Sequence, residues 1–545
     1  MRAIRQSGTS GIASRDTSTR RSDADSRDRG DRASGPAPPA LPAFAAGSVC
    51  AIAAGVVALL LVVGARYGYH HDELYFLEAS RHMAWGYVDQ PPLSVALVGL
   101  SRTVFGDASL WGLRFFPALA FGATVLMTGL AARELGGQRF AQAFAALLIA
   151  ISPFLIAAHL AGPTVYDLMF WSLAALLVIR ILRTDDQRLW LLVGAVVGVA
   201  LLNKQTILFL VIGLVAGFLV NRQWRLFAAP WFWLAALIAI AIWSPNLLWQ
   251  AQHGWPVFEM SGSLQANHSG LADSITFVIL QFVLPGPWSA PVWLAGLWAL
   301  WHEQRLRRYR AFAVAYLLLF LTIGVALGDR AYYVGPLYVV LFAVGAGITA
   351  DVVAGRRRFF SERPPKRRRL WRSQRAAWLW VGVFAAVMLP VSLPLLPASV
   401  LATLPLQKAN YNMGEEIGWP ELARTVADVY YSLPPAERAK TAIIGGNYGE
   451  SGAIDRYGPA LGLPRAYSGH NSYWWWGPPP DGVDSAILIG WSVEWAPTVF
   501  DSVKQAATVE NASDVDNDEE GMPILLARGM QASWSDVWRQ FRHYD

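Results

Sequence analysis

Apolar segments about as long as a lipid bilayer is thick recur along the first 400 residues of this chain. A helix needs roughly 20 apolar residues to cross the hydrocarbon core, where every backbone amide must be paired within the segment. Only 15% of the residues are charged, against about a quarter in soluble proteins. We therefore predict a polytopic α-helical membrane protein with about eleven spans. The segments that predict the spans are 45–65, 113–132, 140–158, 166–183, 189–203, 206–221, 229–249, 274–300, 310–327, 333–353 and 376–396.

Arginine clusters fall between alternate pairs of these segments. Short cytoplasmic loops carry an excess of Lys and Arg, so the clusters indicate the cytoplasmic side. With an odd number of spans, the N-terminus lies in the cytoplasm and the C-terminal region outside. Two long loops, 67–112 and 250–273, then lie on the outer face. The clusters are Arg133 and Arg139, Arg183 and Arg188, Arg222 and Arg225, 305–310, and 356–375.

Residues 1–43 are rich in Arg, Ser, Asp, Gly and Pro and contain few large apolar residues. Such a composition cannot bury enough surface to offset the entropy lost on ordering, so we predict a disordered cytoplasmic tail. The single cysteine, Cys50, excludes an intramolecular disulfide and a cysteine-based zinc site. The basic residues cluster in short loops between apolar segments, so nucleic acid is not an expected partner.

The pattern changes beyond residue 396. Residues 397–545 contain 10 Lys and Arg but 19 Asp and Glu. Strand-like apolar runs at 441–444, 486–489 and 523–527 alternate with amphipathic stretches such as 421–432 and 500–507, which indicates a small soluble α/β domain. We therefore expect a tail at 1–43, a membrane domain at 44–396 and an extracytoplasmic α/β domain at 397–545.

The first outer loop contains the acidic pair Asp72 and Glu73, preceded by His71 and followed by Gln90 before two prolines. Carboxylates beside a membrane surface are candidate acids or bases. The alternative is that Asp72 caps an interfacial helix whose dipole favours Glu73.

Two charged residues lie at the outer ends of predicted spans. Asp167 is close to the start of the fourth, where an ionisable group is costly and usually faces inward. Its alternative reading is again a helix cap. Lys204 interrupts the apolar pattern on the outer side, where a lysine runs against the charge bias. It is a candidate phosphate ligand or a lysine that extends its ammonium to the interface.

Further candidates lie near the outer ends of later spans. His253 belongs to a Trp- and Pro-rich loop, in which histidine is more often structural. Arg330 precedes Tyr332 and Tyr333, and a guanidinium with phenol hydroxyls suits a phosphate. An aromatic belt with one anchoring arginine is the competing interpretation.

These motifs, taken in order and on one side, resemble those of bacterial glycosyltransferase family 39, whose relatives include protein O-mannosyltransferases and lipid A aminoarabinose transferases. The resemblance covers roughly residues 50–350, and segments 446–450 and 468–474 also resemble C-terminal domains attached to some bacterial members. The motifs that carry it are 71–73, 89–93, Asp167, 203–205 and 332–336.

The resemblance implies a GT-C fold in a bacterial inner membrane and an inverting transfer of a sugar from a polyprenyl-phosphate donor to an acceptor hydroxyl on the outer face. Asp72 matches the acidic residue expected to act as general base, with Glu73 and Asp167 as further catalytic candidates. Lys204, Arg330, Tyr332, Tyr333 and Gln90 would bind the donor phosphate. The acceptor would be a lipid, a glycan or a protein, and membrane lipids are further partners. No cofactor is predicted. No motif establishes a metal site, and the sequence does not decide whether the reaction requires a divalent ion.

One departure separates this chain from the aminoarabinose transferases, which carry Lys-Pro-Pro where it has Gln90-Pro91-Pro92. A neutral amide donates a hydrogen bond but cannot neutralise a phosphate. The donor site would therefore depend more on Lys204 and Arg330.

Two alternatives stand beside this hypothesis. A transporter or lipid flippase would also use many spans, but the spans show no evident internal repeat and few charges near their midpoints, although Pro285-Gly286-Pro287 does interrupt one span. In the C-terminal region, His470, Asn471 and the tryptophans at 474–476 are either a glycan-binding surface or ordinary loop and core residues.

Overall fold

The computed structural model describes residues 41–267, 270–326, 330–355, 367–404 and 406–544. Residues 42–545 form one compact unit. The tail predicted at 1–43 falls outside the described residues except for its last three positions. The basic segment at 356–375 also lies partly outside them.

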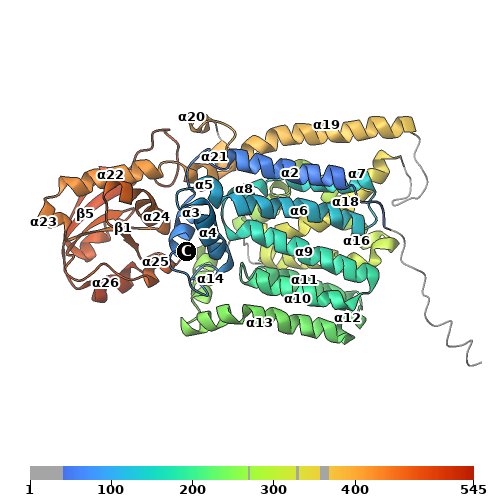
Figure 1. The fold of residues 1–545 in the computed structure, drawn as a ribbon, viewed down its shortest axis with the longest axis horizontal. Coiled ribbons are helices and arrows are strands. Elements are labelled where there is room, and N and C mark those ends of the chain that lie inside the picture. The colour runs from blue at the N-terminus through green and yellow to red at the C-terminus, as the bar shows by residue number, and fades with distance from the viewer. Residues whose placement is uncertain (1–40, 268–269, 327–329, 356–366, 405, 545) are drawn as a thin grey trace, which may run out of the picture. The chain divides into compact units, whose positions relative to one another are not determined.

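Six helical segments among the described residues are long and apolar enough to cross a membrane, or seven if a bent pair counts as one span. Figure 1 shows several of them running side by side. The six segments are Ala46–Val63 (α2), Leu110–Glu134 (α5, Leu110–Leu113, with α6, Phe115–Glu134), Pro163–Thr184 (α9), Pro230–Gln252 (α13), Ala331–Val353 (ending in α18, Tyr338–Val353) and Gln374–Ser392 (within α19, Arg367–Ser392).

The remaining predicted spans are shorter helices. A helix of 12 residues, such as α7 or α10, rises only about 18 Å, less than the hydrocarbon core of about 30 Å. Helices are therefore present in every predicted segment, but the part of the chain that the structure describes does not contain eleven full-length spans. These shorter helices are α7 (Arg139–Ala150), α8 (Leu155–His159), α10 (Trp190–Leu201), α11 (Ile207–Val220) and α17 (Arg310–Leu319), which continues as the π-helix η4 (Phe320–Ala326). Two further short helices, α4 (Leu93–Phe105) and α12 (Arg225–Ala228), lie outside the predicted spans.

The bent pair consists of Ala272–Val283 in α15 (Leu271–Val283) and Pro287–His302, which includes α16 (Ala290–His302), at an angle of 74°. The bend falls at Pro285-Gly286-Pro287, the interruption visible in the sequence. Gly286 has φ +90°, and a Cβ there would lie 2.2 Å from the Phe384 ring. Only glycine fits this corner without strain.

The two long segments predicted to be outer loops contain helices of their own. In the first, α3 (His71–Ala79) precedes α4. In the second, α14 (Pro256–Asn267) follows α13. The 3₁₀ helix η7 (Tyr411–Glu416) follows the short helices α20 (Ala398–Leu401) and α21 (Leu406–Ala409).

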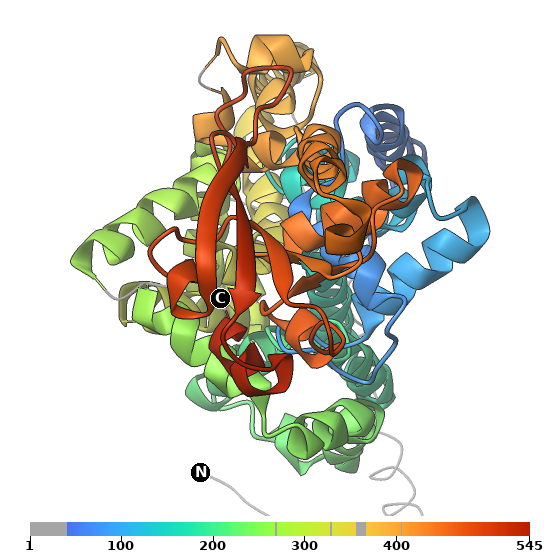
Figure 2. The ribbon, with the colours of Figure 1, turned by 90° about the vertical axis from the view of Figure 1, so that its left-hand side faces the viewer.

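A five-stranded mixed sheet forms beyond η7, with the strand order β2-β1-β3-β5-β4. Figure 2 shows its strands as orange to red arrows. β1 pairs in parallel with β2 and β3, and β5 pairs antiparallel with β3 and β4. The strands are β1 (Thr441–Gly445), β2 (Ala466–Ser468), β3 (Ser485–Ile489), β4 (Phe500–Thr508) and β5 (Pro523–Met530).

All three strand-like runs predicted from the sequence are strands. The amphipathic stretch at 500–507 is the edge strand β4, whose side chains are largely exposed. Helices α22 (Trp419–Ser432) and α24 (Tyr448–Tyr457) cover one face of the sheet, and α26 (Trp534–Phe541) covers the other. Two short helices, α23 (Pro435–Arg438) and α25 (Ser472–Trp475), lie in the connections between these elements.

The sheet shares a hydrophobic core with the loop segment 67–112. Ile443 and Ile487 of the sheet belong to the same buried cluster as Leu74 and Phe76 of α3. Helix α24 lies directly against α3 (Figure 1). The C-terminal region is therefore packed onto the loop that carries Asp72.

Glycines allow this close approach. A Cβ at Gly449 would lie 2.7 Å from the Cβ of His71, and a Cβ at Gly452 would lie 2.9 Å from the Cβ of Leu74 and 3.0 Å from its backbone carbon. Such distances are far below van der Waals contact. Neither a Cβ nor a backbone atom of α3 can rotate away.

We predict that Gly452→Ala lowers the thermal stability of the purified protein in detergent. Overpacking of this kind costs about 1–3 kcal/mol. Gly382→Ala is the matched control, because Gly382 is an exposed glycine in α19 with no atom within 4 Å of its ideal Cβ. There the higher helix propensity of alanine, up to about 1 kcal/mol, should raise stability. Equal melting shifts in the two variants would contradict the close packing of α24 on α3.

Candidate active site

Asp72 lies in the first turn of α3 but does not cap it. The cap is His70, whose Nδ1 accepts from the backbone N–H of Asp72 at 3.2 Å. Glu73 completes the capping box by accepting from the backbone N–H of His70 at 3.0 Å. The capping role considered for Asp72 thus falls to its neighbours, and the Asp72 carboxylate is left for other contacts.

The side chain of Asp72 is 44% exposed. Its Oδ1 accepts a hydrogen bond of 2.8 Å from the Tyr448 hydroxyl and lies 3.4 Å from Nε2 of His71. Burial raises the pKa of this carboxyl, but His71, His70, the Tyr448 hydroxyl and Lys204 together hold the pKa below its ordinary value. Asp72 is therefore ionised at neutral pH.

His71 lies between two carboxylates. Its Nδ1 is 3.0 Å from Oε2 of Glu415, and its Nε2 faces Asp72. Burial alone would lower the pKa of the imidazole, but Asp72 and Glu415 raise the pKa to about 9. At neutral pH the ring is a cation that hydrogen-bonds to Glu415 through Nδ1 and forms an ion pair with Asp72 through Nε2.

Glu73 faces the opposite way and is completely buried. It accepts from Nε of Arg114 at 2.9 Å, from Nη2 of Arg114 at 2.6 Å and from the backbone N–H of Ala161 at 2.8 Å. Nη1 of the same guanidinium lies 3.1 Å from Oε2 of Glu416, which is also 3.2 Å from Nε2 of His159. Every oxygen of Glu73 is thereby occupied, so the structure favours a structural role for this residue over the catalytic role considered above.

Asp89 is a carboxylate that the sequence reading did not single out. It accepts a hydrogen bond of 2.6 Å from the Tyr75 hydroxyl. Burial raises the pKa of Asp89 to about 6, and the nearby charge of Asp72 acts in the same direction. The Asp-Gln-Pro-Pro motif could have indicated this carboxylate, but the motif predicted a site role only for Gln90.

Lys204 lies in the short loop between α10 and α11, which hydrogen bonds fix to two other motifs. The Leu202 carbonyl accepts from the N–H of Leu93 at 2.7 Å, and the Asn203 amide donates to the Pro163 carbonyl at 2.9 Å. The 89–93 motif, the start of α9 and the Lys204 loop thus converge, although the sequence separates them by many residues.

Asp167 lies within α9 and is buried. Its two oxygens accept from Nε1 of Trp171 at 3.0 Å and from Oγ1 of Thr206 at 2.8 Å. The charge of Lys204 acts on this carboxylate. Asp167 therefore supports the Lys204 loop, and it does not cap its helix.

The ammonium of Lys204 lies over two aromatic rings. The centroid of Tyr332 is 4.7 Å from Nζ, and that of Tyr333 is 5.6 Å away. Nη1 of Arg330 donates to the Tyr332 hydroxyl at 3.3 Å. Two cations and two phenols thus form one cluster, here called the cation–phenol cluster, defined by Lys204, Arg330, Tyr332 and Tyr333.

Electrostatic contacts connect this cluster to Asp72. Lys204 contributes to the low pKa of Asp72. The side chain of Tyr411 in η7 is exposed, and the charges of Asp72, Arg330 and Tyr332 act on its hydroxyl. Sequence reasoning missed Tyr411, which carries no motif signal of its own.

Gln90 is buried beside the start of α4. Its Oε1 accepts from the Ser94 hydroxyl at 3.1 Å, while its Nε2 has no hydrogen-bond partner among the described residues. The amide therefore has an unused donor.

The remaining three predicted residues lie outside this group. His253 stacks on Trp249 and contacts the edge of Trp475. His470 stacks on Tyr448 at 4.5 Å and accepts from its backbone N–H, so it lies behind the ring that reaches Asp72. Asn471 is buried, with φ +47°, and donates its backbone N–H to the His543 carbonyl.

A metal ion has one candidate site among the described residues. Ligand atoms of His70, His71 and Asp72 lie within 4.8 Å of one another. A metal requires neutral imidazoles, whereas His71 is held as a cation by two carboxylates. The three residues therefore fit an ion pair better than a metal centre at neutral pH.

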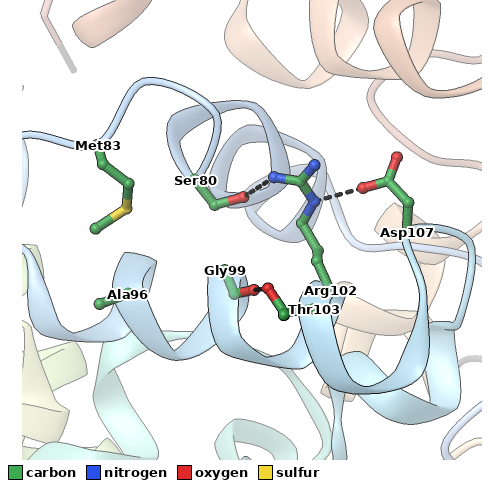
Figure 3. A pocket seen from close by; sticks show the side chains of 7 residues that line it. All are labelled: Ser80, Met83, Ala96, Gly99, Arg102, Thr103 and Asp107. Atoms are coloured by element: carbon green, nitrogen blue, oxygen red, sulfur yellow. Dashed lines mark hydrogen bonds and ion pairs between the residues drawn. The ribbon is translucent and has the colours of Figure 1, made fainter.

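A separate cavity of about 480 Å³ lies between α3 and α4 (Figure 3). The Arg102 guanidinium spans from Ser80 to Asp107 there and is neutralised by that carboxylate. None of the predicted site residues lines this cavity. Its lining consists of Ser80, Met83, Ala96, Gly99, Arg102, Thr103 and Asp107.

Comparison with known proteins gives a family match inside the membrane region. Residues 89–249 match the family described as dolichyl-phosphate-mannose-protein mannosyltransferase. A curated relative, the lipid A galacturonosyltransferase RgtD of Rhizobium johnstonii, is 24% identical over 240 residues. The match covers 43% of this chain and 50% of that protein, so it spans about half the length of the relative.

Solved structures share the fold. ArnT from Cupriavidus metallidurans, solved bound to undecaprenyl phosphate, matches with a TM-score of 0.57 and 18% identity, covering 88% of this chain and 98% of that one. Its apo structure gives a TM-score of 0.58 at 18% identity, over 89% and 98%. The arabinofuranosyltransferase AftD from Mycobacteria gives 0.51 at 15% identity, over 90% and 40%. The predicted resemblance and the helical GT-C fold are thereby confirmed.

We predict that Glu73→Gln destabilises the protein by about 3–5 kcal/mol, because it leaves a buried guanidinium short of a charged partner. Glu421→Gln is the control, since its exposed pair with Arg424 should contribute at most about 1 kcal/mol. Thermal unfolding in detergent measures both. A Glu73→Gln protein that melts like the wild type but transfers no sugar would restore the catalytic assignment of Glu73.

Proposed function

Since residues 89–249 of this chain match the dolichyl-phosphate-mannose-protein mannosyltransferase family, we propose that it is a membrane glycosyltransferase. It transfers a sugar from a polyprenyl-phosphate donor to an acceptor hydroxyl on the outer face, with inversion. The observation that carries the proposal is an ionised, half-exposed carboxylate, Asp72, within the field of Lys204 in the cation–phenol cluster.

Asp72 is the proposed general base. Its carboxylate takes the proton of the acceptor hydroxyl while the oxygen attacks the anomeric carbon from the face opposite the phosphate. The bond between that carbon and the phosphate oxygen breaks, and the phosphate keeps the electron pair. A single displacement inverts the configuration. Positive charge that develops on the sugar ring is stabilised by the neighbouring carboxylate.

The cation–phenol cluster is the proposed site of the donor phosphate. Lys204 and Arg330 supply charge, and the hydroxyls of Tyr332 and Tyr333 supply hydrogen bonds to the leaving oxygens. The unused Nε2 donor of Gln90 is a neutral addition to this set. Asp167 holds the Lys204 loop through Thr206, so we assign it a positioning role.

A similar fold binds undecaprenyl phosphate in ArnT, which supports a polyprenyl phosphate as the carrier. The bend at Pro285-Gly286-Pro287 is an interruption of the kind that transporters also have, but the fold shared with ArnT supports transfer over the alternative of a transporter or flippase. The acceptor is a lipid, a glycan or a protein, and a screen of labelled polyprenyl-phosphate sugars with purified protein identifies the donor. The reaction as proposed needs no cofactor.

The topology belongs to the same proposal. About eleven crossings, several of them made by short helices, place the N-terminus in the cytoplasm. Residues 397–545 then lie outside a bacterial inner membrane, on the side of the loops at 67–112 and 250–273. The arginine clusters between alternate segments support this orientation.

We predict that Asp72→Asn lowers the transfer rate about 100- to 10,000-fold, the range that a general base contributes. The variant should fold, because Asn keeps the shape and Asp72 is not part of the buried Arg114 network. Turnover of the labelled donor found in the screen measures the effect. Asp107→Asn, an exposed aspartate paired with Arg81 and Arg102, is the control. Undiminished turnover in Asp72→Asn would remove Asp72 as the base.

We predict that Lys204→Met raises the KM for the donor about tenfold or more, the magnitude of one charge-assisted hydrogen bond. Lys504→Met, on the exposed face of β4, is the matched control. Initial rates over a range of donor concentrations separate KM from kcat. An unchanged KM would show that the donor phosphate binds elsewhere.

A further inference from the structure

We propose that the C-terminal region forms part of the catalytic centre. In it, Tyr448 positions Asp72 by donating a hydrogen bond to one of its two carboxylate oxygens. This inference rests on the proposed function, because it assumes that Asp72 is the base. It goes further by assigning a role to a segment whose sequence lies 376 residues away from that base.

The two side chains that contact the Asp72 carboxylate, one by a hydrogen bond and one by an ion pair, approach the same oxygen. The Tyr448 hydroxyl is 2.8 Å from Oδ1, and Nε2 of His71 is 3.4 Å from it. Oδ2 has no donor among the described residues. A carboxylate held at Oδ1 presents Oδ2 in a fixed direction, so Oδ2 is the oxygen that takes the acceptor proton. Tyr448 only donates and passes no proton on.

The Tyr448 ring is held in place from several sides. It stacks on Tyr75 at 4.7 Å and on His470 at 4.5 Å. Tyr448 is the first residue of α24, and the side chain of Asn447 directly before it accepts from the backbone N–H groups of Gly449 and Glu450. A ring fixed in this way loses little entropy when its hydroxyl is bonded, which suits a positioning residue.

The phenol stays protonated. Burial raises the pKa of Tyr448 well above its ordinary value, and the negative charges of Asp72 and Asp89 act in the same direction. The hydroxyl is therefore a donor throughout the pH range in which Asp72 titrates.

A second interaction from the C-terminal region acts on Asp72 through His71. Glu415, in η7, holds Nδ1 of His71 at 3.0 Å. The charge kept on His71 favours the ionised form of Asp72. Lys204 on the neighbouring loop is a further cationic group that acts on this carboxylate. His70, the residue before α3, is neutral at neutral pH, because burial lowers its pKa to about 4.

Tyr448→Phe removes one oxygen atom and tests the proposal. Loss of a charge-assisted hydrogen bond to Oδ1 should raise the pKa of Asp72, so the acidic limb of the kcat/KM profile moves to higher pH by about one unit. The kcat at neutral pH should fall about tenfold because Oδ2 is less well aligned. The KM for the donor should stay unchanged, since Tyr448 does not touch the cation–phenol cluster.

Tyr473→Phe is the matched control. It removes another buried tyrosine hydroxyl, one that binds Asp455 at 2.9 Å and has no contact with Asp72. Its pH profile should match that of the wild type. Melting temperatures of both variants in detergent show whether the C-terminal region stays docked. If Tyr448→Phe does not fold, Glu415→Gln tests the interaction that acts through His71. The acidic limb of the kcat/KM profile of this variant should also move to higher pH.

Two results would overturn the inference while leaving the proposed function intact. One is a Tyr448→Phe enzyme with the wild-type profile, and the other is a loss of kcat with an unmoved acidic limb. Asp72→Asn, assayed in parallel, separates the two ideas. Full activity in that variant removes the base itself, and an inactive Asp72→Asn beside a normal Tyr448→Phe removes only the positioning role.

Discussion

The buried guanidinium of Arg114 holds together the parts that form the candidate active site. It contacts Glu73 of α3, Glu416 of η7 and His159 of α8, and it donates to the carbonyls of Gly64 and Gly68. Removing such a charge from water costs several kcal/mol, and the cost is offset only when its partners are complete. Five chain segments therefore have to meet correctly at once, and the start of α3 is fixed as a result.

The direction of Asp72 follows from that anchor. Successive residues of a helix point about 100° apart, so when Glu73 faces Arg114 its neighbour faces elsewhere. Glu73 is fully buried and Asp72 is half exposed. Adjacent acidic residues look equivalent in a sequence, which is why both were candidates for catalysis. Only the packing of the helix separates the anchor from the proposed base.

The sequence therefore predicts the chemistry of individual outer segments better than their assembly. The membrane class, the bend at 285–287 and three of the strands could be predicted, because length, Pro-Gly-Pro and apolar runs are local signals. The shared core of α3, α24 and the sheet could not, since residues 397–545 read as a separate domain. The Tyr448 contact depends on Gly449 and Gly452, whose effect appears only when Leu74 and His71 lie against them.

The effect of Gln90, which stands where the aminoarabinose transferases carry a lysine, depends on the residues around it. Ser94 holds the amide oxygen, and the Leu93 to Leu202 hydrogen bond ties the motif to the loop that carries Lys204. A lysine at position 90 would add a second charge beside Lys204, whereas the amide adds a donor without one. Charge compensation of the leaving phosphate then falls to Lys204 and Arg330. Because both contact Tyr332, the phosphate site and the aromatic cluster act as one unit.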